Sequence, residues 1–351
     1  MPEVPSFTWL LSLAWERFWT VGLLLTLASW LSALTGTIIY YVWQYRPADG
    51  APRNVRNFLR FCIPASLLTN RTLRTDIGFA LLIKLFDMVA LAPLLVGGGV
   101  LAVYVDHLAT LWFGARERVE PGWITWLLVI TAVIVVQDFV IFIRHYGEHR
   151  IRLLWEFHKV HHSPEDLFPT ANRRHHPFER FFEAATNTAA AGIFIGLVSY
   201  AMHMPVVSTM FFGVDVIYAL DLLSFYHLRH SHVALSFGKL EKFFLSPAQH
   251  HLHHSCEERD WDVNMGTILS IWDRMFGTIR YTDHSYQFER GLVPEERADY
   301  DNLFKLMVVP VLRAGGMIFE WFRPKRSAAA RVPSVAPTET LPADAIPQGG
   351  D

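Results

Sequence analysis

The chain has 351 residues, of which 52% are hydrophobic and 18% are charged, and its formal net charge is −2. This charge balance excludes a broad basic surface for nucleic acid, and the presence of only two cysteines excludes a disulfide framework and a CxxC metal site. The apolar residues form blocks long enough to cross a bilayer, which takes about 20 residues of helix. Buried helices of a large soluble enzyme are the alternative, but the blocks lack the polar face that soluble helices need.

In chain order, the apolar blocks predict an all-α integral membrane protein with about four to five transmembrane helices. Three single helices are expected at about 21–42, 77–105 and 123–143. The region 184–226 is too long for one span and predicts a hairpin that turns near residues 203–205.

Loop charge predicts the orientation of these helices. The segments 45–76 and 144–183 are rich in arginine, whereas 106–121 holds only Arg116 and Arg118. Under the positive-inside rule the two rich segments are cytoplasmic. A bacterial inner membrane is favoured, with the endoplasmic reticulum membrane expected in a eukaryotic host.

Histidines are concentrated between residues 145 and 254, which hold 15 of the 17 in the chain. Three groups have helical spacing, so that the imidazoles of each group share one helix face. These groups are His145 and His149; His158, His161 and His162; and His250, His253 and His254. His230 lies between the second and third groups, and His227 precedes it.

This many imidazoles exceeds the needs of one tetrahedral metal site and suits two metals, each with three to five nitrogen ligands. Imidazole binds Zn, Cu, Fe and Ni, so the ligand type leaves the metal open. Two other classes remain as alternatives. A histidine-rich membrane metal transporter would need ligands along a pathway inside the helices, and a zinc-dependent membrane hydrolase would need a motif such as HExxH, which is absent.

Two runs resemble the histidine boxes of the fatty acid hydroxylase / sterol desaturase superfamily. They read QDFVIFIRHYGEHRIRLLWEFHKVHHSPEDLFPTANRRHHPFER and SPAQHHLHHSCEERDWDVNMGTILSIWDRMFGT, and the resemblance spans about Thr131 to Thr278. It implies a membrane-bound, non-haem di-iron enzyme that uses O2 and two electrons to hydroxylate or desaturate a lipid. A cytoplasmic helical cap would hold the His-rich dimetal site. Candidate substrates are a fatty acyl chain, a sterol or an ether lipid, and the HHSPED stretch is more similar to the ether-lipid and general bacterial members than to sterol C5-desaturases.

The resemblance also implies the site residues. Its boxes match, as metal ligands, His145, His149, His158, His161, His162, His230, His250, His253 and His254. His176 is expected to be either a ligand or a residue in contact with one, and His227 is a weaker candidate of the same kind. Asp138 is expected to accept the free N–H of an imidazole, and Asn264 to bond a ligand or a bound water. His175, His232 and His251 are expected to be neighbours of the site.

No dinucleotide, flavin or haem motif is evident, so the electrons are expected from a separate protein similar to cytochrome b5, a ferredoxin or a reductase. Four regions follow. They are an N-terminal transmembrane region at 1–120, a fatty acid hydroxylase-like catalytic domain at 121–280, a C-terminal cap with an amphipathic helix at 281–323, and a disordered tail at 324–351.

Overall fold

The computed structural model describes residues 26–47, 50–64, 70–87, 89, 92–206, 225–283 and 286–322. Within these ranges the protein is helical and contains no β-strand, only two isolated β-bridges. The all-α prediction is therefore confirmed for the described part of the chain. The start of the first predicted helix, most of the second arm of the predicted hairpin and the predicted disordered tail lie outside the described residues.

The described chain begins with a helix over residues 26–39 that continues into the π-helical turn η1. The elements that follow have these bounds, in chain order: η1 Tyr40–Gln44, α2 Val55–Cys62, α3 Arg71–Phe86, α4 Ala92–Phe113, α5 Trp123–Arg150, α6 Arg152–His162, η4 Pro169–Arg173, α7 Pro177–Ala201, α9 Tyr226–Arg229, η5 Gly238–Lys242, α10 Pro247–His253, η6 Glu258–Asp260, α11 Ile271–Phe276, α12 Pro294–Arg297, η7 Ala298–Tyr300 and α13 Leu303–Phe322.

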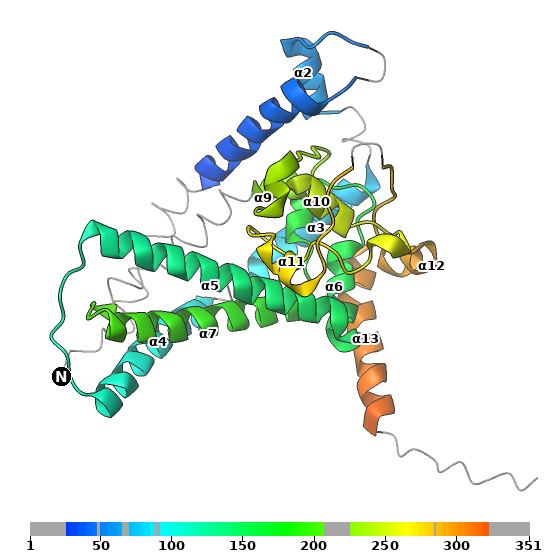
Figure 1. The fold of residues 1–351 in the computed structure, drawn as a ribbon. Helices are drawn as coiled ribbons and strands as arrows, with labels where there is room; N and C mark the ends of the chain where they lie inside the picture. The colour runs from blue at the N-terminus through cyan, green and yellow to red at the C-terminus, as the bar shows by residue number, and fades with distance from the viewer. Residues whose placement is uncertain are drawn as a thin grey trace, which may run out of the picture.

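Helices α4, α5 and α7 form an elongated body, and the shorter helices gather at the C-terminal end of α5 (Figure 1). Among the described residues, α5 and α7 are long and apolar enough to cross a membrane. A third span is present if α12–η7 and α13, which meet at 112°, are counted as one broken span. The protein is thus a membrane protein with two or three candidate spans in its described part. The predicted number of four to five is supported in part, because portions of the first predicted helix and of the predicted hairpin lie outside the described residues.

Glycines allow α4 and α7 to approach closely. Gly192 and Gly196 are one turn apart on α7, and each faces the backbone of α4. A Cβ atom on Gly196 would lie 2.5 Å from the carbonyl oxygen of Ala102, and one on Gly192 would lie 2.6 Å from that of Gly98. Small residues spaced four apart are how membrane helices reach this contact distance.

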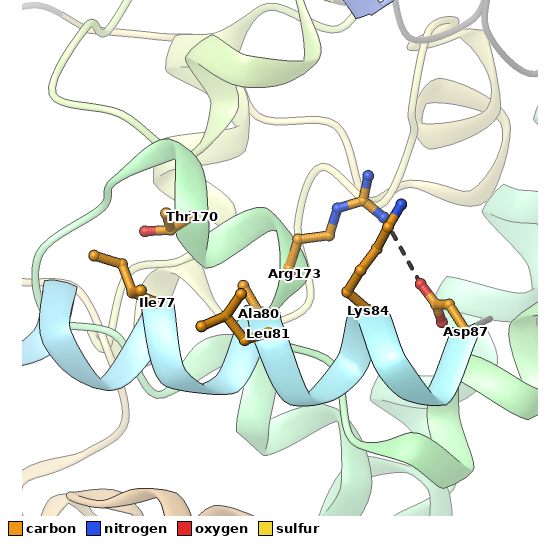
Figure 2. Close-up of a pocket in the computed structure, with 7 residues that line it drawn as sticks. All are labelled: Ile77, Ala80, Leu81, Lys84, Asp87, Thr170 and Arg173. Atoms are coloured by element: carbon orange, nitrogen blue, oxygen red, sulfur yellow. Dashed lines mark ion pairs between the residues drawn. The ribbon is translucent and has the colours of Figure 1, made fainter. Parts of the chain in front are cut away.

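The helix predicted over 77–105 corresponds to α3 and α4, and residues 88, 90 and 91 between them lie outside the described residues. Asp87, at the end of α3, forms ion pairs with Arg180 at 3.2 Å and with Arg173 at 3.9 Å. Figure 2 shows Asp87 and Lys84 on α3 beside Arg173, at the edge of a pocket of about 300 Å³. These ion pairs hold the end of α3 against η4 and α7.

The helices that gather at the C-terminal end of α5 form what we call the cap. Within it, α13 and α3 pack against α6. Their contact is a hydrophobic core that includes Phe79, Val160 and Leu306. The amphipathic helix predicted within 281–323 is present as α13, and its buried residues Leu306, Pro310 and Ala314 recur every four positions. That spacing places one face of α13 on the core and leaves the opposite face exposed.

Candidate metal centre

The first two histidine boxes are separated by one sharp change of direction. His145 and His149 occupy the last turns of α5, and Ile151, with φ −99° and ψ 108°, is extended and ends that helix. Helix α6 then begins at Arg152 and carries His158, His161 and His162 in its last two turns. The chain therefore folds back so that the imidazoles of both helices face one volume.

The third box is placed by a helix start that the local sequence specifies. Ser246 caps α10 by accepting from the backbone N–H of Gln249, and the Gln249 side chain accepts from the backbone N–H of Ser246. This capping box, together with Pro247 at the first helical position, defines where a helix of seven residues begins. His250 and His253 lie on it, and His254 is its C-cap.

Five of the predicted ligands come together in what we term the five-histidine group. One ring nitrogen from each lies within 4.8 Å of the others, and the members are His145, His149, His158, His162 and His253. His145 and His253 direct Nδ1 outward, to the carbonyl oxygens of Met265 and Val263, each at 2.7 Å. Nε2 of both imidazoles is therefore left for the interior of the group.

The other four predicted ligands form a second, adjacent cluster, the four-histidine group, whose members are His161, His230, His250 and His254. Its Nε2 atoms converge. Nε2 of His230 lies 2.9 Å from that of His254, 3.2 Å from that of His161 and 3.3 Å from that of His250. Helices α6 and α10 each contribute histidines to both groups, so the two groups lie side by side.

These distances fit a metal ion. With metal–nitrogen bonds of about 2.1 Å, two nitrogens at right angles lie about 3.0 Å apart, close to the separations in the four-histidine group. Burial, and then the neighbouring imidazoles, hold the pKa of all four rings well below the usual range of histidine. Neutral imidazoles offer lone pairs, and lone pairs that converge without a cation between them would repel. The residues therefore suit a bound cation at each group.

Glu179 is a residue of the site that the sequence analysis missed. Its Oε1 accepts from Nδ1 of His158 at 2.7 Å and from Nδ1 of His175 at 2.8 Å. The ring of His175 in turn stacks on that of His161, with centroids 4.2 Å apart. The available signal was the spacing of His175 and Glu179, four residues apart at the start of an apolar helix.

His176 and His227 belong to neither group. His176 caps α7, with Nδ1 accepting from the backbone N–H of Phe178 at 3.1 Å and Nε2 lying 3.1 Å from the carbonyl oxygen of Met307. His227 stacks on Trp30, with ring centroids 4.1 Å apart. The imidazole of His176 therefore joins α7 to α13, and that of His227 packs on the helix that contains Trp30.

The expectation that Asp138 binds an imidazole is wrong. Its carboxylate accepts from the backbone N–H groups of Ile268 and Leu269 and from the indole N–H of Trp272, at 2.8 to 3.0 Å. The two backbone donors come from the loop before α11 and the indole comes from α11 itself, because this segment packs on the buried face of α5. Asp138 therefore fastens to α5 the loop whose Met265 carbonyl contacts His145.

Asn264 likewise contacts backbone. Its side chain donates to the carbonyl oxygen of Gln249 at 3.1 Å and accepts from the N–H of Arg280 at 2.8 Å. Asn264 has a φ of 54°, a left-handed conformation that asparagine tolerates better than most residues. It joins the first turn of α10 to the segment at Arg280 and does not contact a ligand imidazole in these bonds.

The arrangement defines a class of protein, a helical membrane protein with two adjoining clusters of buried imidazoles at one end of its spans. The family model described as fatty acid hydroxylase matches residues 130–278. This match confirms the resemblance to the fatty acid hydroxylase / sterol desaturase superfamily over that part of the chain.

Curated relatives agree with this family. An alkylglycerol monooxygenase of Caenorhabditis elegans is 24% identical over 201 residues, covering 57% of this chain and 36% of that protein. An ornithine lipid hydroxylase, OlsE, of Rhizobium tropici is 29% identical over 145 residues, covering 41% and 40%. The alkylglycerol monooxygenase of Danio rerio is 30% identical over 160 residues, covering 45% and 31%. The chain thus spans well under half the length of these relatives. No solved structure matches it.

Proposed function

We propose that the protein is a membrane-bound di-iron oxidoreductase that uses O2 and two electrons to hydroxylate a C–H bond of a lipid. The observation that carries the proposal is the division of nine histidines, eight of them buried and His149 half-buried, into two adjacent groups. Two groups favour two metal ions, and the family match favours oxidation of a lipid as the chemistry.

The names of the relatives narrow the reaction. One relative is an alkylglycerol monooxygenase and another an ornithine lipid hydroxylase. Both names describe oxygenation of a lipid that carries a polar head. We therefore favour hydroxylation over desaturation, and a glycerol-type or amino-acid-type lipid over a sterol.

When bound, two iron ions would supply the oxidation of an unactivated C–H bond by O2, which no side-chain acid or base can perform. The nine imidazoles would hold the metals, and their burial would exclude water from the reacting lipid. Glu179 and the carbonyl oxygens of Met265 and Val263 would keep the imidazoles in the tautomer that directs Nε2 inward.

The position of the site supports a lipid substrate and an external electron donor. The five-histidine group begins at the last turns of α5, so it would lie just beyond the membrane on the arginine-rich side that charge predicts to be cytoplasmic. A lipid could enter from the leaflet while a separate cytochrome b5-, ferredoxin- or reductase-like protein delivers electrons. A bacterial inner membrane is the favoured location.

The direct test is elemental analysis and Mössbauer spectroscopy of protein purified in detergent from cells grown on iron-57. We expect one iron ion in each histidine group and magnetic coupling between the two ions, because the groups are adjacent. Lipid analysis of cells with and without the gene would then identify the hydroxylated product. A single zinc ion or no metal in folded protein would overturn the proposal and point to a hydrolytic or non-catalytic role.

A further inference from the structure

Helix α11 lies beside the C-terminal half of α5 (Figure 1), and together with η5 it forms an exposed apolar surface. The segments are η5 with the two residues after it, 238–244, and α11 with the glycine after it, 271–277. Their exposed large apolar side chains are Leu240, Phe243, Phe244, Met275 and Phe276. We call this the η5–α11 surface. An exposed cluster of this kind marks a contact with a protein, a ligand or a membrane.

The two segments are joined to each other and to α5. Arg274 donates to the carbonyl oxygen of Lys242 at 3.3 Å, and Ser270 donates its backbone N–H to that of Phe243 at 3.0 Å. The ring of Phe276 packs edge-on against Phe142 of α5, with centroids 5.0 Å apart. The η5–α11 surface is therefore rigidly placed relative to the membrane helix.

The position of the η5–α11 surface along the axis of α5 indicates where this surface lies relative to a membrane. Helix α5 begins at Trp123, which is 75% exposed, as is typical of tryptophan at a membrane interface. At a rise of about 1.5 Å per residue, Asp138 lies about 22 Å and Phe142 about 28 Å from Trp123 along the helix. The hydrocarbon core of a bilayer is about 30 Å thick. The residues that contact Asp138 and Phe142, among them Trp272 and Phe276, therefore lie near the far boundary of the hydrocarbon core, opposite the interface at Trp123.

The charges of the η5–α11 surface suit lipid headgroups. Lys239, Lys242 and Arg274 are exposed, whereas the two acids in these segments, Glu241 and Asp273, are buried. Glu241 is bonded to hydroxyl groups of Ser236 and Ser246, and Asp273 to that of Thr278. The surface thus presents bases and aromatic rings together, the composition of helices that lie in a membrane interface.

A neighbouring pocket suits hydrocarbon. Leu240 and Phe244 also line a pocket of about 360 Å³, whose other walls are mostly apolar. Its polar members Gln44 and Ser236 bond each other, through Gln44 Nε2 to the Ser236 carbonyl at 2.7 Å and Ser236 N–H to Gln44 Oε1 at 3.0 Å. These groups are occupied, so the pocket favours an acyl chain over a polar ligand.

We propose that the η5–α11 surface is a membrane-contact surface. Phe243, Phe244 and Met275 insert into the acyl region of the leaflet on the side of the histidine groups, and Lys239, Lys242 and Arg274 bind anionic lipid headgroups. The surface anchors the cap to the leaflet independently of the membrane-spanning helices, and this role does not depend on the reaction that the metal centre performs.

The test is electron paramagnetic resonance of single nitroxides on full-length protein in vesicles of phosphatidylcholine and phosphatidylglycerol. Cys62 and Cys256 are first replaced by serine, and then Phe243→Cys and Met275→Cys are labelled separately. Glu258→Cys is the matched control, because Glu258 is exposed in η6, shortly before Asp262, which pairs with Arg150 at the end of α5. Retained metal content shows that each variant is folded.

We expect the nitroxides at 243 and 275 to collide readily with O2 and to be protected from an aqueous nickel complex, while that at 258 remains accessible to nickel. Equal accessibility to nickel at all three positions would overturn the proposal. Protection that appears only at a high ratio of protein to lipid would assign the surface to contacts between copies of the chain. Protection that appears only after a soluble electron-transfer protein is added would assign it to that protein, and both results would also overturn the proposal.

Discussion

Nδ1 of His158 lies 2.7 Å from Oε1 of Glu179, and this bond connects the five-histidine group to the start of α7. The same oxygen accepts from His175, whose ring stacks on His161 of the four-histidine group. One carboxylate therefore orients an imidazole in the first group and supports a ring in the second. Both partners approach a side chain that is only 2% exposed, so water cannot substitute for it.

Glu179→Gln should weaken metal binding without removing a ligand. A neutral amide accepts more weakly than a carboxylate from two N–H groups, and loss of such orienting partners costs about 10- to 100-fold in metal affinity. The measurement is the iron retained by purified protein during dialysis against a chelator. Glu258→Gln on the exposed η6 turn is the control, and equal retention by both variants would contradict the role of Glu179.

His253→Ala and His254→Ala should differ although the residues are adjacent. His253 belongs to the group of five and His254 to the group of four, so the first variant leaves four imidazoles and the second leaves three. We expect His254→Ala to lose more iron, as measured by elemental analysis, and the remaining iron to lose its magnetic coupling. His251→Ala is the control, because His251 contacts the carbonyl oxygen of Leu228 and lies in neither group. An identical loss in all three variants would refute the division into groups.

Asp138→Asn should loosen the loop that follows α10. The amide has one acceptor oxygen where the carboxylate serves three donors, and each buried donor left unpaired costs about 1–3 kcal/mol. Hydrogen exchange at the amides of Ile268 and Leu269 should accelerate, and thermal unfolding should begin at a lower temperature. Unchanged protection of these two amides would show that the carboxylate does not hold the loop.

Gly196→Ala should destabilise the contact between α4 and α7. The added methyl group would lie 2.5 Å from the carbonyl oxygen of Ala102, so the helices must separate, and overpacking of this kind costs about 1–3 kcal/mol. Gly97→Ala on α4 is the matched control, because a Cβ there meets nothing within 4 Å. The unfolding temperature in detergent should fall for Gly196→Ala alone.

Asp76 should make the stability of the cap depend on pH. It is buried against Arg174 at 2.9 Å, and burial raises its pKa from 3.8 to about 6 despite the nearby guanidinium. Because the folded pKa exceeds the unfolded one, the folded state binds the proton first as the pH falls. Asp76 therefore disfavours folding fully above about pH 6, and this penalty is relieved between about pH 6 and 3.8.

The unfolding temperature of wild type minus that of Asp76→Asn isolates this contribution from other titrating groups. The difference should grow in favour of wild type as the pH is lowered from neutral to about 4, since only wild type gains a proton at this position. A difference that is constant with pH would show that the Asp76 carboxyl does not titrate in this range.

The spacing of the histidines was sufficient to predict which residues gather, because positions three and four apart on a helix share a face and buried imidazoles require partners. His145 with His149, and His250 with His254, fall into common groups as that rule suggests. The apolar blocks were likewise sufficient to predict α5 and the first arm of the hairpin, which is α7, since backbone groups in lipid must bond within their own helix.

The amino-acid sequence by itself thus determined the helical class, the resemblance to the family and which nine histidines gather. Only the tertiary structure decided how those residues are divided. His158, His161 and His162 share one face of α6, yet His161 turns to the group completed by His230 while the other two turn to α5. It also decided that Asp138 bonds the loop before α11, that Glu179 bonds an imidazole, and that Asp87 at the end of α3 pairs with Arg180 of α7. Spacing along one helix specifies a direction, whereas the partner found in that direction depends on how distant segments pack, and periodicity within one segment carries no information about that packing.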